Sequence, residues 1–160
     1  MARRLWSSGL CLALLTGCNI TSNLHVMQPV TPPTEEITLS LRSSTPTISE
    51  ERLSQLRTQL TTKLASEKIA VLPTPGPNTA RLEGTVDHYD RGSRAKRAWL
   101  GSGFGTFDSS WHVVDGAGRE IGHCRIDGRL TGGWFGGSYE DLLDEIGERV
   151  AQCLRNQPRS

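Results

Sequence analysis

The sequence lacks several features that large classes of protein require: a long apolar run, an excess of basic residues and a serine-nucleophile motif. Its longest largely apolar stretch, from Leu5 to Leu15, is well short of the ~20 residues that a membrane-spanning helix needs. Its 18 basic and 17 acidic residues nearly cancel, so the charge does not indicate a nucleic-acid binder. It contains no Gly-x-Ser-x-Gly motif, which leaves a serine nucleophile without local support. These common kinds of enzyme, channel and nucleic-acid-binding protein are therefore not indicated.

Two glycine-rich segments lack the residues that bind nucleotides. Residues 101–106 read Gly-Ser-Gly-Phe-Gly-Thr, and Thr106 stands where a dinucleotide-binding loop has its last glycine. Residues 132–138 have glycines near the spacing of a phosphate-binding loop, but the lysine that neutralises phosphate is missing. Neither segment predicts nucleotide binding, and no cofactor is expected.

The first eighteen residues resemble the export signal of a bacterial lipoprotein. Arg3 and Arg4 precede the short apolar stretch, as in the n-region and h-region of a signal peptide. The stretch ends in Leu15-Thr16-Gly17-Cys18, which resembles a lipobox. The resemblance implies cleavage before Cys18 and acylation of that cysteine, so that lipid anchors the protein on a membrane. The alternative is an ordinary cleaved signal with an incidental cysteine.

The residues after the cysteine suggest a location and a spacer. In enteric-type bacteria an Asp after the lipidated cysteine resembles an inner-membrane retention signal, so Asn19 favours the outer membrane, facing the periplasm. Residues 19–36 contain Thr31-Pro32-Pro33-Thr34 and few large apolar groups, which predicts an extended chain. The expected organisation is a signal peptide (1–17), a lipidated N-terminus with a flexible tether (18–36), and a single domain (37–157).

Apolar periodicity predicts an α+β domain. Leucines from Leu53 to Leu64 form one helical stripe after the capping-box pair Thr47 and Glu50. A second stripe, Leu142 to Leu154, follows the typical N-cap Ser138. Short alternating or apolar runs predict strands at residues 37–41, 69–72, 82–86, 107–113 and 123–130. A single sheet of about five strands, mostly antiparallel, with two helices packed on one face buries these stripes.

The last two strands are expected to form a hairpin. Residues 115–119 read Asp-Gly-Ala-Gly-Arg, a typical turn. A turn centred on Ala117 and Gly118 pairs Trp111 with Cys124 on the core face and His112 with His123 on the outer face. Two imidazoles on one face make His112 and His123 weak candidates for metal binding. An ordinary polar face is favoured, so no metal site is predicted.

Two cysteines remain once Cys11 leaves with the signal peptide and Cys18 is acylated. Cys124 falls on the core face of a strand and Cys153 on the apolar face of the last helix. A disulfide needs Cα atoms ~4.4–6.8 Å apart, which is tight between a helix and a sheet. Two buried thiols are therefore favoured over a possible disulfide, although the periplasm is oxidising.

Residues 82–155 carry a second resemblance. The motifs are Leu-Glu-Gly-Thr-Val at 82–86, Arg-Gly-Ser-Arg-Ala at 91–95, Leu-Gly-Ser-Gly-Phe-Gly at 100–105, Val-Asp-Gly-Ala-Gly-Arg-Glu-Ile at 114–121, and Gly-Gly-Trp-Phe-Gly-Gly-Ser at 132–138. Together they resemble an uncharacterised family of small bacterial lipoproteins, domain of unknown function 4410. Ser109-Ser110-Trp111-His112 departs from the family pattern, which is richer in Val and Ala there. The resemblance implies a fold and a location, but no reaction.

Aromatic and basic residues gather in the two glycine-rich segments. The candidate binding residues are Trp99, Phe104, Trp134, Phe135, Arg94, Lys96 and Arg97. Large aromatic groups flanked by glycine are poorly shielded, and such groups in clusters mark an interface. The basic residues would rim this surface and attract an acidic partner or anionic lipid headgroups. The alternative is a solvated loop whose aromatic side chains fold back onto the core.

Three functions remain open. The favoured one is a non-catalytic envelope lipoprotein that binds another envelope protein through the glycine and aromatic segments. The second is a small enzyme with a metal or carboxylate site on the outer hairpin face. The third is a carrier of a small apolar ligand held between helices and sheet. The first is preferred because no group of polar residues has catalytic spacing.

Overall fold

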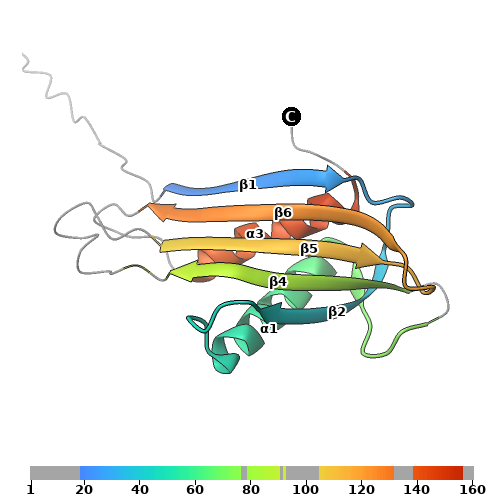
Figure 1. The fold of residues 1–160 in the computed structure, drawn as a ribbon, viewed down its shortest axis with the longest axis horizontal. Helices are drawn as coiled ribbons and strands as arrows, with labels where there is room; N and C mark the ends of the chain where they lie inside the picture. Colours follow the sequence, from blue (N-terminus) through green and yellow to red (C-terminus); the bar gives the residue numbers. More distant parts are fainter. Residues whose placement is uncertain (1–18, 77–78, 91, 93–104, 132–138, 157–160) are drawn as a thin grey trace, which may run out of the picture.

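The structure, a computed structural model, describes residues 19–76, 79–90, 92, 105–131 and 139–156 (Figure 1). Within these ranges it has six strands and two helices. In chain order they are β1 (Asn19–Gln28), β2 (Glu36–Ser43), α1 (Glu50–Ser66), β3 (Ala70–Val71), β4 (Ala80–Asp90), β5 (Gly105–Val114), β6 (Glu120–Thr131) and α3 (Tyr139–Leu154). The strands form one sheet in the order β1-β6-β5-β4-β2-β3, and both helices cover the same face.

The α+β class and the layering agree with the expectation, but the sheet is more mixed than expected. It has six strands rather than about five. The β1–β6, β6–β5 and β5–β4 pairs are antiparallel, whereas β2 pairs in parallel with both β3 and β4. The reason is α1, which carries the chain back along the sheet between β2 and β3 and so makes these two strands parallel.

The expected tether is wrong over residues 19–28, which form the edge strand β1. Ile20, Leu24 and Val26 are partly buried and alternate with exposed residues, the period of two that a strand requires. The segment contains few large apolar side chains, so this alternation is a weak signal in the sequence. Ser22, which lies on the same face, is fixed to α3. Its hydroxyl donates to Glu145 Oε1 at 2.7 Å and accepts from Arg149 Nε at 2.8 Å. β1 is therefore part of the domain.

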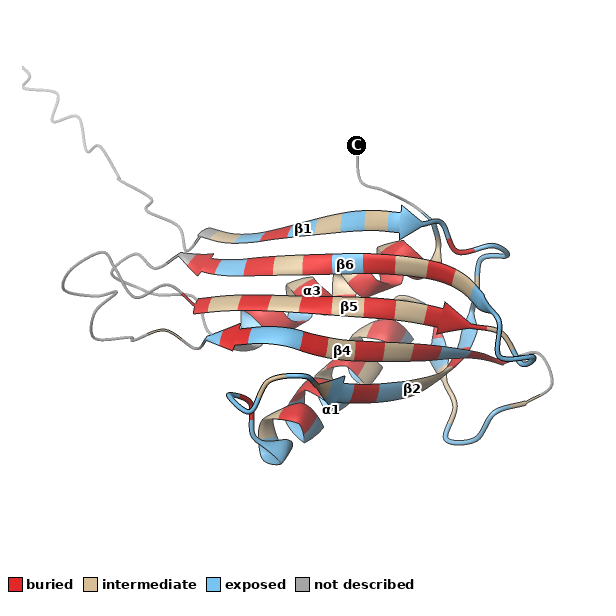
Figure 2. Ribbon diagram, viewed as in Figure 1, coloured by how far each residue is buried: buried red, intermediate tan, exposed pale blue. Residues whose placement is uncertain are grey.

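The core fills the space between the sheet and the two helices. Figure 2 shows buried and more exposed residues alternating along β4, β5 and β6. Phe107 and Trp111 of β5 are the largest side chains that are fully enclosed. The indole N–H of Trp111 donates to Ser109 Oγ at 2.8 Å, so this buried polar group is satisfied. α1 begins after Ser49, whose hydroxyl accepts from the Arg52 amide, rather than after the expected Thr47.

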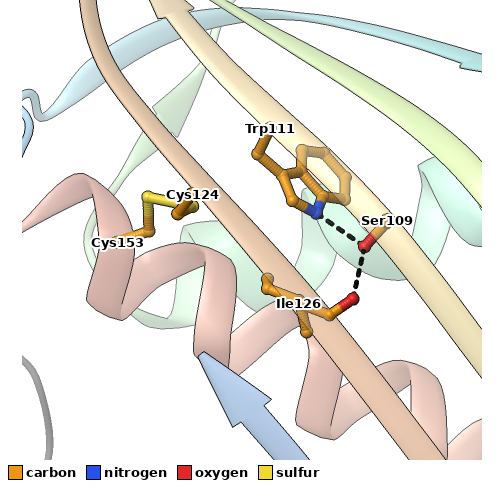
Figure 3. Close-up of a disulfide and its surroundings, with 5 residues drawn as sticks. All are labelled: Ser109, Trp111, Cys124, Ile126 and Cys153. Carbon is orange, nitrogen blue, oxygen red and sulfur yellow. Dashed lines mark hydrogen bonds between the residues drawn. A yellow bond between two sulfur atoms is a disulfide. The ribbon is translucent and has the colours of Figure 1, made fainter. Parts of the chain in front are cut away.

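A disulfide joins Cys124 of β6 to Cys153 of α3 (Figure 3). This corrects the expectation of two buried thiols. The Cα atoms lie 6.4 Å apart, inside the range that a bridge requires, because α3 packs directly on β6 at this point. Both cysteines are buried, so the bridge crosses the core between helix and sheet.

Candidate functional site on the outer sheet face

The face of the sheet opposite the helices is polar and carries all four histidines. His25 lies on β1, His88 on β4, His112 on β5 and His123 on β6. His25 and His88 are exposed, whereas His112 and His123 are half-buried. This outer face is where the structure brings titratable side chains together from strands far apart in the sequence.

The predicted pairing across the β5–β6 hairpin is confirmed. Trp111 pairs with Cys124 and His112 pairs with His123. The two imidazole rings are stacked, with centroids 4.1 Å apart and planes inclined by 21°. The core face and the outer face of the hairpin are therefore those that the alternating sequence indicates.

Glu120 completes a cluster that the sequence did not reveal. Its Oε2 lies 2.8 Å from Nδ1 of His112, and donor atoms of His112, Glu120 and His123 all lie within 4.8 Å of one another. An uninterrupted ladder would place Glu120 on the same face as Gly122 and Cys124, toward the core. A register shift between Val113 and Val114 pairs Val114 with Glu120, which turns the carboxylate to the outer face.

The hairpin turn fixes the chain just before Glu120. The Asp115 carboxylate accepts hydrogen bonds from the backbone N–H groups of Arg119 and Ala117 and from the Arg119 guanidinium. The Arg119 amide and these other donors hold the pKa of Asp115 below its ordinary value of 3.8, against the opposing effect of desolvation. Gly118 has φ +82°, the left-handed conformation that this turn requires. The turn therefore sets where β6 begins.

A second polar cluster lies further along the same face. His25 Nε2 is 2.6 Å from Asp127 Oδ1, and Asn23 Nδ2 donates to Asp127 Oδ2 at 2.8 Å. Both oxygens of this carboxylate are thus engaged by neighbours on β1. The arrangement is an ordinary exposed cross-strand pair between β1 and β6.

The expected binding segments meet one end of the sheet. Asn19 pairs with Thr131, Gly105 with Leu130, and Asp90 with Thr106, so the start of β1 and the adjoining ends of β4, β5 and β6 lie together (Figure 1). Cys18 and the predicted binding residues lie outside the described residues; the latter are Trp99, Phe104, Trp134, Phe135, Arg94, Lys96 and Arg97. The segments that hold them connect to this end.

A hollow of about 580 Å³ lies elsewhere, at the C-terminal end of α1. Its lining is Pro33, Thr34, Glu35, Ser66, Glu67, Lys68 and Arg155. Arg155 is paired with Glu67 at 3.0 Å. A carrier of an apolar ligand needs an enclosed apolar cavity, and this open hollow, lined mostly by polar and charged residues, does not have that character.

Comparison with known families decides what kind of chain this is. Residues 28–131 match the family model for domain of unknown function 4410. The chain belongs to this family. The match begins at the end of β1 and runs to the end of β6, so it takes in most of the sheet and overlaps the resemblance noted at residues 82–155. A comparison with curated protein sequences gave no match.

The first two of the following solved structures share the fold at low sequence identity. A protein from Xanthomonas campestris is 8% identical, with a TM-score of 0.56, over 81% of this chain and 91% of that one. The PelC dodecamer from Paraburkholderia phytofirmans is 12% identical, with a TM-score of 0.52, over 87% and 99%. A minor lipoprotein from Acinetobacter baumannii is 14% identical, with a TM-score of 0.47, over 76% and 92%. Among the described residues, no helix is long and apolar enough to cross a membrane.

Proposed function

We propose that this protein is a lipid-anchored, non-catalytic lipoprotein of the cell envelope that binds another envelope protein at the membrane surface. The acylated residue is Cys18, in Leu15-Thr16-Gly17-Cys18. Two or more acyl chains anchor a protein stably, because each buried CH₂ contributes ~0.8 kcal/mol. Asn19 favours the outer membrane, with the domain facing the periplasm.

The observation that carries the proposal is the position of β1. Its first residue, Asn19, directly follows Cys18 and pairs with Thr131. With no spacer between anchor and sheet, the lipid would hold this end of the sheet against the membrane. The segments with the candidate aromatic and basic residues leave from the same end, after β4, before β5 and after β6. A partner bound there would be met at the bilayer surface.

The anchoring half is tested by replacing Cys18 with Ser. The variant cannot form the thioether, so it should remain unprocessed or become soluble, whereas the wild type sediments with membranes. Immunoblots of fractionated cells report both the location and the size of the protein. If Cys18→Ser is processed and sediments as the wild type does, the lipoprotein assignment is wrong.

The binding half is tested at Trp134, with Met27 as the control position. A photo-crosslinking residue at 134 should capture a discrete envelope partner in living cells. The same residue at 27 should not capture this partner, although Met27 is 66% exposed, because it lies at the far end of β1. Trp134→Ala, tested in the same cells with an added chemical crosslinker, should reduce capture of this partner and leave thermal unfolding unchanged. A large fall in melting temperature with capture unchanged would show that Trp134 fills the core instead.

A further copy of this chain is a candidate for a second partner, which would bind along the edge strand β1 rather than at Trp134. β1 is a ten-residue edge strand that has β6 as its one strand neighbour among the described residues, and it contains neither Lys nor Pro. Such edges favour pairing with another chain. The fold is also shared with a protein whose structure is described as a dodecamer. Light scattering of the detergent-extracted protein, with Asn23→Pro as the edge-blocking variant, tests this assembly.

A further inference from the structure

The two histidines and the glutamate on the outer hairpin face have the composition of a metal site. His112 and His123 come from paired positions on β5 and β6, so the sheet fixes their Cα atoms relative to each other. Glu120 comes from the start of β6, where the register shift turns its carboxylate outward. All three side chains are thus positioned by the backbone ladder.

We propose that His112, His123 and Glu120 bind one divalent transition-metal ion of the zinc type. Imidazole nitrogens and a carboxylate oxygen suit Zn²⁺ and its neighbours, whereas Ca²⁺ and Mg²⁺ take oxygen ligands. Three protein ligands leave the fourth position of a tetrahedral zinc site open to water or another ligand.

The spacing is close to what coordination requires. Zinc lies ~2.0–2.1 Å from its nitrogen and oxygen ligands, so two ligand atoms of a tetrahedral site are about 3.3 Å apart. The donor atoms of the cluster lie within 4.8 Å of one another, and the His112–Glu120 pair is at 2.8 Å. Changes of up to about 1.5 Å between donor atoms, by side-chain rotation, would close the site.

The side chains have the freedom for this rotation. The stacked rings must tilt so that their nitrogen lone pairs converge on one point. His112 has a side-chain exposure of 35% and Glu120 one of 42%, so neither is locked in the core. The carboxylate also offsets one charge of the ion, which two neutral imidazoles cannot do. The fourth position would face solvent, open to water or to a donor atom of another molecule.

The other two histidines provide matched controls. His25 and His88 lie on the same outer face, on β1 and β4, but are not part of this cluster. Replacing either with Gln removes one imidazole from the same sheet surface. A general affinity of surface histidine for metal would respond to all four changes, whereas a built site responds only to its own ligands.

The experiment is a calorimetric titration of ZnCl₂ into the signal-cleaved protein in detergent, after bound metal has been removed with EDTA. We expect one Zn²⁺ per chain, and His112→Gln, His123→Gln and Glu120→Gln should each weaken binding by at least about tenfold. His25→Gln and His88→Gln should stay within about twofold of the wild type. Saturating zinc should raise the melting temperature of the wild type by roughly 5–10 °C and leave the His112→Gln/His123→Gln double variant unchanged.

Two results would overturn the proposal. One is the absence of zinc binding by the wild type, and the other is equal binding by the wild type and the double variant. Unchanged melting temperatures of all variants in EDTA would show that they fold, since the substituted side chains lie on the outer face. Loss of binding in His25→Gln would also contradict the assignment, because it would place the ion on the β1 cluster instead.

Discussion

Replacing Gly84 with Ala should destabilise the domain, because Gly84 gives Trp111 its place in the core. Gly84 pairs with Trp111 across β4 and β5. A Cβ at Gly84 would lie 2.3 Å from Cζ3 and 2.7 Å from Cη2 of the indole. It would also lie 2.8 Å from Leu41 Cδ1, which is the end of a flexible side chain. Trp111 is fully buried and hydrogen-bonded to Ser109, so moving the ring aside would cost free energy.

The size of the effect follows from that overlap. Carbon atoms pack at about 3.5–4.0 Å, so the new methyl group would overlap the ring by more than about 1 Å. Overpacking of a core costs ~1–3 kcal/mol, and this contact belongs at the upper end. Alanine returns ~0.5–1 kcal/mol, since glycine weakens a strand through its backbone entropy. The net loss should be about 2 kcal/mol, or roughly 8 °C in melting temperature for a domain of this size.

A double-mutant cycle with Trp111→Phe tests the cause. Phenylalanine lacks the second ring of the indole, so Gly84→Ala should cost almost nothing in that background. The coupling free energy from urea unfolding should be about 2 kcal/mol. Gly128→Ala on β6 is the control, because its Cβ would meet Leu142 Cδ1 at 2.9 Å and nothing else closer than 3.7 Å. Additivity of Gly84→Ala and Trp111→Phe within about 0.5 kcal/mol would refute the reasoning.

The disulfide and the hairpin turn give three further predictions. Cys153→Ser should lower the free energy of unfolding by about 3.5 kcal/mol, given the sequence separation of 29 between the cysteines. Thiol titration of the denatured, unreduced wild type should find neither Cys124 nor Cys153 free. Because the pKa of Asp115 is lower in the folded than in the unfolded protein, its carboxylate stabilises the fold above pH 3.8. This stabilisation is lost as the pH falls through the folded pKa. Asp115→Asn should therefore narrow the difference between the free energies of unfolding in urea at pH 6 and at pH 3. Gly118→Ala has open space for its Cβ, so the loss, expected at ~1 kcal/mol, measures backbone strain less the entropy gain of replacing glycine.

The hairpin was predictable because two independent patterns agreed on it. Alternation along β5 and β6 named the buried face of each strand, and the turn residues between Asp115 and Arg119 fixed which positions pair. A slip of one residue would have put Trp111 outside and His112 inside, so burial selects a single register. The pairing of His112 with His123 followed from the sequence for this reason.

Glu120 and the disulfide were not predictable from the same patterns. Strict alternation places Glu120 on the core face. No residue at 113–120 predicts the register shift that turns its side chain to the outer face. The distance between Cys124 and Cys153 depends on how closely α3 packs on β6, which periodicity does not specify. Both features depend on tertiary distances of a few ångströms rather than on which face a residue occupies.

The amino-acid composition of residues 19–28 hides β1, although the alternation of its residues is that of a strand. Few large apolar groups and the nearby prolines favoured a tether, yet Ile20, Ser22, Leu24 and Val26 already alternate. An edge strand has one neighbour and needs only a modest apolar face, so its signal is weak. The prolines at 32 and 33 come after β1 and before β2, where they end pairing rather than prevent it.

The position of β1 also separates the two proposed activities in space. The anchor would adjoin Asn19, which lies at the same end of the sheet as Leu130. His123 lies seven residues from Leu130 along β6, about 24 Å at the rise of a strand. A zinc ion held by the hairpin would therefore lie about that far from the proposed anchor rather than beside it. Cys18→Ser should leave zinc affinity unchanged, and His112→Gln should leave membrane fractionation unchanged. If either substitution altered both zinc affinity and membrane fractionation, the two ends of the sheet would have to be energetically coupled. Such coupling needs an element with two alternative conformations, and the continuous strand pairing between the two ends provides none.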